Sequence, residues 1–268
     1  MRPLTCEIRL DYLRDNYQYL KALHGNKLLA VMKANAYGHG AVQCARALHD
    51  AADGFAVAFL EEAVELREAG ITKPIVVLEG VFQAADYAAV AEYRLWPVVH
   101  CQAQLEGLLA FDWREPATVW LKMDSGMHRT GFFPHNYAAA FAALRQSGKV
   151  GEIVKMSHFA CADETERGMT QMQLEAFDLA CAGLDGAESL ANSAAIMAYP
   201  EARRDFRQPE TGDALEKRGV RRAGVAAARA DWLRRFVLHQ AFHAGGRGGG
   251  GLCGRLSAPR RERYAGGD

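Results

Sequence analysis

Residues 28–40 read LLAVMKANAYGHG, an apolar run that carries Lys33 to its end and passes into a loop containing Gly38 and Gly40. A lysine at the end of a buried strand can lose its proton by desolvation and attack a carbonyl group to form a Schiff base. The Tyr and Gly residues that follow suit a loop that closes around a phosphate group. An isolated lysine at such a position is more commonly the partner of an acidic residue in a salt bridge, so the rest of the chain has to decide between these roles.

Similar apolar runs recur along the chain and alternate with helical patterns. Seven strands are predicted, at residues 27–34, 55–59, 74–79, 95–100, 118–124, 153–159 and 189–193. Between them lie segments with apolar residues three and four positions apart, such as 60–69 and 169–184, which predict amphipathic helices. Regular alternation of helices with apolar strands indicates a parallel sheet that is covered by helices.

Polar residues follow these strands at their C-terminal ends. They are Lys33, Glu79, His100, Asp124, His158 and Asn192. Parallel α/β folds collect their chemistry at this edge of the sheet. A doubly wound open sheet is the alternative, but no GxGxxG motif follows the first strand, so we expect a (β/α)8-type TIM barrel. A complete barrel needs eight strands, and only seven are predicted before Arg203.

Composition restricts the expected partners. The chain has 268 residues, of which half are hydrophobic, and a formal net charge of zero, so bulk charge gives no reason to expect binding to nucleic acid or to a membrane. We find neither an apolar run long enough to span a bilayer nor a signal peptide. The six cysteines form no CxxC pair and lie mostly in apolar patterns, which predicts buried thiols in a reducing cytoplasm. We expect a small-molecule substrate and no metal.

The charge is distributed unevenly. From Arg203 onward, 15 Lys and Arg residues stand against 7 Asp and Glu residues, and residues 245–251 are nearly all Gly. We therefore divide the chain into a barrel domain, residues 1–203, and an aberrant Arg/Gly-rich segment, residues 204–268. A natural disordered tail is one interpretation of this segment. A nucleic-acid tether is another, because such tails gain affinity electrostatically, but few aromatic residues support it.

Three further stretches carry candidate site residues. Residues 122–132 read KMDSGMHRTGF, in which Arg129 presents a planar charged group suited to a phenolate or a carboxylate. Residues 156–163 read MSHFACAD and place His158 at a strand end. Residues 191–195 read ANSAA, where Ser193 is predicted to be both a helix N-cap and a phosphate ligand. Taken singly, a surface ion pair and a buried core histidine are the plainer interpretations of Arg129 and His158.

Together with AVMKANAYGHG, these stretches resemble, in the same order, the motifs of the alanine racemases, and the resemblance covers residues 1 to about 203. It implies a pyridoxal 5′-phosphate-dependent isomerase of fold-type III that interconverts L-alanine and D-alanine and supplies D-alanine for peptidoglycan. It also implies a homodimer in which a β-rich domain follows the barrel. Lys33 would form the Schiff base with the cofactor and act as the base for D-alanine. A tyrosine from the partner subunit's β-domain would serve L-alanine.

The roles of the other site residues also follow from the resemblance. Arg129 is expected to contact the phenolic oxygen of the cofactor and the substrate carboxylate. Lys122 corresponds to a lysine that is often carbamylated in the family and orients that arginine. His158 is expected to lie beside the pyridine ring and to direct a hydrogen bond toward the second base. The cofactor-binding residues implied in this way are Lys33, Tyr37, Arg129, His158, Asn192 and Ser193.

The resemblance ends near Arg207. Relatives continue with an R-P-G…L-Y-G segment that forms the eighth strand and supplies an arginine to the pyridine nitrogen, and this chain lacks that segment. Back-translation from the second base of each codon permits family-like segments at Pro209–Leu215, Asp231–Leu233 and Gly251–Pro259. We therefore expect residues from about 207 onward to be an out-of-frame product, which the coding DNA tests.

That expectation has a functional consequence. It predicts a barrel without its eighth strand and without the following β-domain, and a racemase that is weak or inactive. The alternative function is that of a single-domain carrier that binds pyridoxal phosphate without racemase activity.

Overall fold

The structure is a computed structural model, and it describes residues 6–204. The Arg/Gly-rich segment and the expected change of reading frame concern residues outside this range, except for Arg204.

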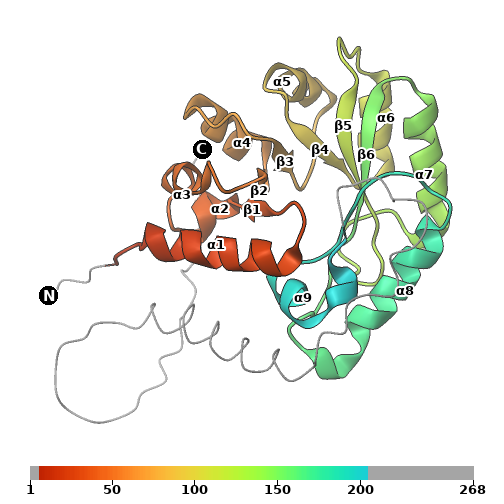
Figure 1. Cartoon of the computed structure of the whole chain (residues 1–268). Helices are drawn as coiled ribbons and strands as arrows, with labels where there is room; N and C mark the ends of the chain where they lie inside the picture. Colours follow the sequence, from red (N-terminus) through yellow and green to blue (C-terminus); the bar gives the residue numbers. More distant parts are fainter. Residues whose placement is uncertain (1–5, 205–268) are drawn as a thin grey trace, which may run out of the picture. The chain divides into compact units, whose positions relative to one another are not determined.

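Seven parallel strands form one curved sheet, in which they follow one another in the order of the sequence (Figure 1). They are β1 (Leu29–Val31), β2 (Gly54–Val57), β3 (Ile75–Val77), β4 (Trp96–Val99), β5 (Ala117–Lys122), β6 (Val150–Met156) and β7 (Glu188–Ser189). Sequential order is the topology of a barrel, whereas a doubly wound sheet reverses its strand order at a switch point. The barrel-type fold is thus confirmed, although β1 and β7 are shorter than predicted and β6 begins and ends three residues earlier.

Helices connect the strands and cover the outer face of the sheet (Figure 1). Helix α4 packs against β2 and β3, and α7 packs against β6. The helices are α1 (Leu10–His24), α2 (Lys33–Tyr37), α3 (Ala41–Leu48), α4 (Leu60–Glu68), α5 (Tyr87–Glu92), α6 (Gln102–Ala110), α7 (Pro134–Gln146), α8 (Met169–Cys181) and α9 (Ser193–Ala198), with 3-10 turns at Ala84–Asp86, Thr165–Arg167 and Pro200–Ala202. The predicted helices at 60–69 and 169–184 correspond to α4 and α8.

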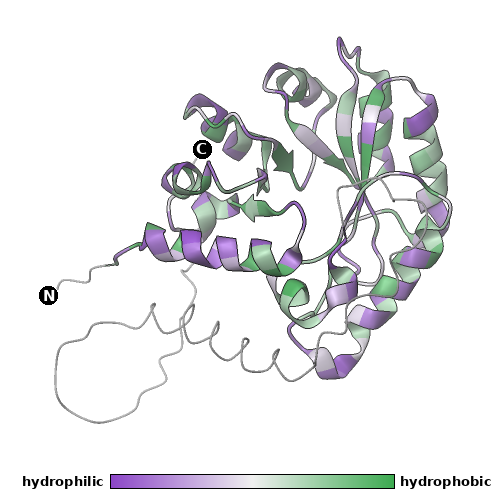
Figure 2. Cartoon of the chain, viewed as in Figure 1, coloured by the Kyte–Doolittle hydropathy of each residue, from purple (hydrophilic) through white to green (hydrophobic). Residues whose placement is uncertain are grey.

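Side chains of the central strands alternate between two buried clusters. Phe55, Ile75 and Leu121 belong to the larger cluster between the sheet and the helices. Val76 and Trp120 belong to a second cluster on the opposite, inner face of the sheet, where Trp120 is 1% exposed. Because both faces are buried, the strands need no polar alternation, which explains why they occur in the sequence as continuous apolar runs (Figure 2).

The sheet has two edges among the described residues. Strand β1 pairs only with β2, and β7 pairs only with β6, within residues 6–204. Helix α1 packs against α3 and α9, which lie near opposite ends of that range. A closed barrel has no edges, so the described strands form a barrel that is open between β7 and β1, as the count of seven predicted strands implies.

The cysteines are only partly as predicted. All five within the described range are free thiols; Cys44 and Cys181 are buried, Cys101 and Cys161 are partly exposed, and Cys6 is exposed. Burial raises the pKa of the Cys181 thiol to about 12. In the same part of the chain, no helix combines the length and the apolar character that crossing a bilayer requires.

Candidate active site

Four basic side chains come from the C-terminal ends of three strands, β1, β5 and β6, or from the loops that follow them. Lys33 follows β1, Lys122 ends β5, Arg129 lies in the loop after β5, and His158 follows β6. Burial and the positive charges of Arg129, Lys122 and Lys33 together lower the pKa of His158 to about 4. Like charges exert such effects only at short range, so these three basic side chains lie near an imidazole that is neutral at pH 7.

Lys33 begins a short turn with unusual backbone geometry. Strand β1 ends at Val31 rather than continuing to residue 34 as predicted, and all four residues of the segment 34–37 have φ between 52° and 54°. This is a left-handed turn, which costs roughly 1–2 kcal/mol for each residue other than glycine. Backbone strain of this kind concentrates at functional sites and persists only where the surrounding structure supports it.

Glu62, near the start of α4, supports this turn from outside. One carboxylate oxygen accepts a hydrogen bond from the backbone N–H of Ala34 at 2.6 Å. The other oxygen accepts from the backbone N–H groups of Ala58 and Phe59 at 2.8 and 3.1 Å. Hydrogen bonds to a charged acceptor are stronger than those between neutral groups, so Glu62 joins the residue after Lys33 firmly to the end of β2.

The turn also has internal support. Asn35 Oδ1 accepts a hydrogen bond from the backbone N–H of Ala41 at 2.7 Å, and asparagine tolerates positive φ better than most residues. Lys33 is half-buried, and its Nζ lies 5.9 Å from the centroid of the Tyr37 ring. Tyr37 is 60% exposed. The structure therefore brings these two predicted site residues together.

Lys122 is a buried lysine at the centre of the candidate site. It is 6% exposed, and its Nζ donates a hydrogen bond to Thr130 Oγ1 at 2.6 Å. Burial lowers its pKa, and the nearby charge of Arg129 acts in the same direction, while Glu79 and Asp124 oppose the shift. A lower pKa increases the neutral fraction of the amine, which is the form that reacts as a nucleophile.

The loop that carries Arg129 is held by a buried carboxylate. Asp124 is 6% exposed, and its Oδ1 accepts hydrogen bonds from the backbone N–H groups of Gly126 and His128 at 3.0 and 2.9 Å. Gly131 has a φ of 135°, and a Cβ there would lie 2.4 Å from the backbone nitrogen of Asp124. Only glycine fits this close approach, so the loop returns tightly onto the strand end from which it started.

A pocket of about 390 Å³ opens beside this loop. It is lined by His100, Cys101, Asp124, His128, Arg129, Thr130, Gly131 and Phe133. The Arg129 side chain is exposed, and it makes no hydrogen bond or ion pair with another residue in the range 6–204. The guanidinium group is thus available to an anionic ligand.

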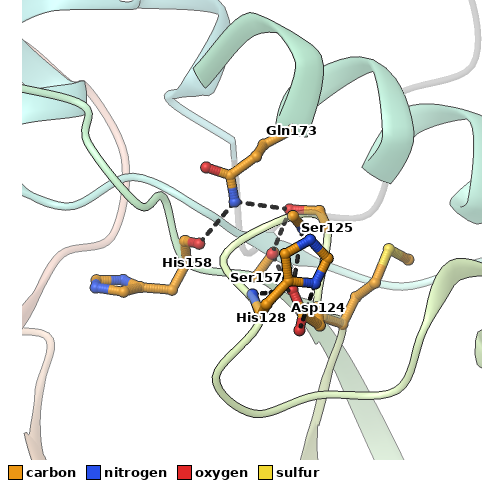
Figure 3. Close-up of polar contacts among 8 residues, drawn as sticks. Asp124, Ser125, His128, Ser157, His158 and Gln173 are labelled. Atoms are coloured by element: carbon orange, nitrogen blue, oxygen red, sulfur yellow. Dashed lines mark hydrogen bonds and ion pairs between the residues drawn. The ribbon is translucent and has the colours of Figure 1, made fainter. Parts of the chain in front are cut away.

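Behind the strand ends lies a polar network that sequence analysis did not identify (Figure 3). The hydroxyl oxygens of Ser125 and Ser157 lie 2.8 Å apart. Gln173 of α8 donates hydrogen bonds to Ser125 Oγ at 3.3 Å and to the carbonyl oxygen of His158 at 3.0 Å. Its own carbonyl oxygen accepts from the backbone N–H of Ala160 at 2.9 Å. The network joins the loop after β5 to the segment after β6.

Asn192 and Ser193 lie after β7, at the same edge of the sheet, but their roles differ from the prediction. Asn192 is the N-cap of α9, because its side chain accepts a hydrogen bond from the backbone N–H of Ala195 at 2.9 Å. Ser193 is the first residue of the helix, and it is exposed. The prediction that Ser193 is the N-cap is therefore wrong. Asn192 accepts the hydrogen bond at the start of the helix, and the hydroxyl group of Ser193 remains available.

Two residues that hold the site were missed by the sequence analysis, and each left a weak signal. Gln173 shares its helix face with Thr170, Leu174 and Phe177, all of them buried, so a polar residue stands at a core-facing position of an amphipathic pattern. Glu62 lies in the first turn of a predicted helix, where a helix cap is the ordinary role of an acidic residue. Its bond to Ala34 could not be read from that position.

Comparison with known proteins identifies the family. The family model described as alanine racemase, N-terminal domain, matches residues 8–215. An alanine racemase from Neisseria meningitidis serogroup C / serotype 2a is 67% identical over 206 residues, which are 77% of this chain and 58% of the relative. One from an Azoarcus species is 54% identical over 209 residues, 78% of this chain and 59% of the relative.

Solved structures agree with the sequence comparison. The biosynthetic alanine racemase from Pseudomonas aeruginosa superposes with a TM-score of 0.73 at 47% sequence identity, covering 76% of this chain and 57% of that one. The matched region thus spans somewhat under three fifths of the length of these relatives. The fold and the family match agree, and the chain belongs to the alanine racemase family, whose N-terminal domain it contains.

Proposed function

We propose that this chain supplies the cofactor-lysine face of an alanine racemase active site, with pyridoxal 5′-phosphate held on Lys33. The observation that carries the proposal is the convergence of the Lys33, Lys122 and Arg129 side chains on the neutral imidazole of His158. Lys33 and the exposed Arg129 supply positive charge that suits a ligand with a phosphate group and a substrate with a carboxylate group.

The described residues fit the cofactor. Ser193 presents an exposed hydroxyl at the N-terminus of α9, and backbone N–H groups at a helix start favour phosphate. Tyr37 lies beside Lys33 and is exposed. In this proposal Tyr37, Asn192 and Ser193 bind the phosphate end, and Arg129 binds the phenolic oxygen.

The chemistry that the bound cofactor supplies is withdrawal of electrons from the α-carbon of alanine, which acidifies its α C–H bond. The chain's own residues do the rest. Lys33 Nζ takes or returns the α-proton on the face of D-alanine. Arg129 orients the substrate through its carboxylate. His158 remains uncharged at pH 7, so it provides hydrogen bonds without adding to the positive charge of the site.

Lys122 positions Arg129 in this scheme. Its lowered pKa favours the neutral amine, which would add to carbon dioxide by forming an N–C bond and releasing a proton from the nitrogen. The carbamate would convert a buried cation into an anion close to Arg129, and opposite charges at such a distance attract. We therefore propose that Lys122 is carbamylated and that its carbamate holds the guanidinium group in place.

Racemisation needs an acid–base group on each face of the substrate. The family resemblance implies that the second group is a tyrosine of the partner subunit's β-domain, and the family match on this chain ends at residue 215. We propose that this chain exchanges the α-proton at the Lys33 face but racemises weakly or not at all. For the family, the resemblance implies a homodimer in the cytoplasm that supplies D-alanine for peptidoglycan.

The test is to incubate the purified chain with pyridoxal phosphate and D-alanine in heavy water, and to follow deuteration and chirality. We expect deuterated D-alanine with little L-alanine. Lys33→Ala should abolish both the exchange and the cofactor adduct trapped by borohydride. An adduct on another lysine would refute the assignment of Lys33. Rapid appearance of L-alanine would show that a second base is present, whereas trapped cofactor without exchange would indicate a pyridoxal-phosphate carrier.

A further inference from the structure

Gln173 is a buried amide that faces the candidate active site from behind. It lies on α8 and is 1% exposed. A buried amide is destabilising unless its polar atoms are hydrogen-bonded, and both polar atoms of Gln173 have partners. None of the three partner groups belongs to its own helix.

The partners determine the orientation of the amide group. The backbone N–H of Ala160 can only donate, so the atom that it meets is Oε1. The carbonyl oxygen of His158 can only accept, so the atom that it meets is Nε2. Gln173 therefore pairs with residues 158 and 160 as a neighbouring strand would, and it holds the backbone on both sides of Phe159. Figure 3 shows the His158 carbonyl turned toward Gln173 while its ring extends away.

The same amide reaches the loop that carries Arg129. Its second N–H donates to Ser125 Oγ at 3.3 Å. Ser125 is 7% exposed and bonds to Ser157, whose hydroxyl in turn donates to the carbonyl oxygen of Met123 at 2.9 Å. The loop also passes close to the glutamine stem, because a Cβ on Gly126 would lie 3.3 Å from Gln173 Cγ.

We propose that Gln173 is a positioning residue, whose single amide group fixes the segment carrying His158 relative to the loop carrying Arg129. The proposal rests on the proposed function insofar as these two side chains act on cofactor and substrate. Hydrogen bonds to three separate backbone or side-chain groups leave the amide no other orientation, and a buried network that is fully satisfied specifies one arrangement. Loss of the amide would remove hydrogen bonds from both the loop after β5 and the segment after β6.

The chain offers a matched control in Gln104 of α6. Gln104 is 7% exposed, donates to the carbonyl oxygens of Glu79 and Val81 at 2.8 and 3.0 Å, and accepts from the backbone N–H of His100 at 2.9 Å. It thus makes the same kind of contacts at the ends of β3 and β4. Replacing either glutamine with methionine removes an amide of equal size from an equally buried position.

The experiment is an NMR titration of the histidine rings in the full chain without cofactor, with His158 assigned through His158→Gln. In the wild-type protein its midpoint should lie near pH 4, since burial and the charges of Arg129, Lys122 and Lys33 lower the pKa. In Gln173→Met we expect the midpoint to rise by about one pH unit, a tenfold change in the protonation constant, as the ring gains access to water. Gln104→Met should lose similar thermal stability without this rise.

Gln173→Glu provides a second variant if the methionine protein does not fold. It keeps the acceptor for Ala160 and loses both donors, so a smaller rise of the His158 midpoint is expected. An unchanged midpoint in a folded Gln173 variant, or an equal rise in Gln104→Met, would overturn the proposal. The titration needs no cofactor, so it tests the role of Gln173 independently of the proposed function. A wild-type chain that fails to bind pyridoxal phosphate would refute the proposed function alone.

Discussion

Replacement of His158 by glutamine should make the stability of this protein less sensitive to acid. In the folded protein burial lowers the pKa of His158 to about 4, and the charges of Arg129, Lys122 and Lys33 contribute to the shift. In the unfolded chain the ring titrates near the ordinary value of about 6.5. Between these two values the unfolded state binds more protons than the folded state, so the free energy of unfolding falls as the pH falls from about 7 to 4.

The magnitude follows from the two pKa values. Their difference corresponds to about 3 kcal/mol when the pH is below both, and to about 2 kcal/mol at pH 5. At pH 7 the ring is neutral in the folded protein and about three-quarters neutral in the unfolded chain, so its contribution there is only about 0.2 kcal/mol. The free energy of unfolding should therefore differ measurably between pH 7 and pH 5, which are both mild conditions.

The assay is urea-induced unfolding at pH 7 and pH 5 for the wild-type protein, His158→Gln and His135→Gln. His135 is an exposed histidine on α7 and serves as the control for loss of an ordinary imidazole. We expect the wild-type protein and His135→Gln to lose about 2 kcal/mol more than His158→Gln over this interval. Equal losses in all three proteins would refute the conclusion that His158 is held neutral by burial among cations.

Three further predictions concern the residues that hold the site. Glu62→Gln should lower the free energy of unfolding by about 1–2 kcal/mol, because it weakens three hydrogen bonds to a charged acceptor. The control is Glu61→Gln at an exposed position, which should change this free energy by less than about 0.5 kcal/mol in the same urea assay. Gly131→Ala should lower the free energy of unfolding by more than about 2 kcal/mol, because its Cβ would meet the backbone of Asp124. Gly183 has a φ of 77° and open space around it, so Gly183→Ala should cost only about 1 kcal/mol. In protein kept free of carbon dioxide, so that Lys122 is an unmodified amine, Lys122→Met should abolish a gain in stability as the pH rises toward the ordinary lysine pKa of about 10.4. A lysine whose pKa is lowered in the folded protein binds fewer protons below that pH than it does in the unfolded chain. An equal gain in both proteins would contradict this.

Most of the candidate site could be predicted because parallel strands share one direction. Each strand delivers the residue that follows it to the same edge of the sheet, so Lys33, Asp124, His158 and Asn192 could be placed near one another from the strand pattern alone. The strand pattern alone could not place Arg129, because a position in a loop does not show where its side chain points. The family motifs supplied that information, and Gly131 shows why the loop is short and tightly closed.

Other features depended on contacts between distant parts of the chain. The bond between Gln173 and Ser125 joins residues 48 positions apart, and that between Glu62 and Ala34 joins residues 28 positions apart. Local patterns of three to four residues contain no information about such pairs. The cap of α9 was predicted one residue too late because Asn192 and Ser193 both suit an N-cap, and only the hydrogen bond to Ala195 distinguishes them.

The class of fold follows from the amino-acid sequence alone, because strand and helix periodicities are local and because apolar strands without polar alternation require burial on both faces. The residue types that reach the C-terminal ends of the strands follow from it too. How these residues act depends on contacts between distant parts of the chain. The left-handed turn after Lys33 exists because Glu62 and Asn35 stabilise it, and His158 is neutral because other elements bury it and bring three cations around it. Both are consequences of packing, which no single segment contains.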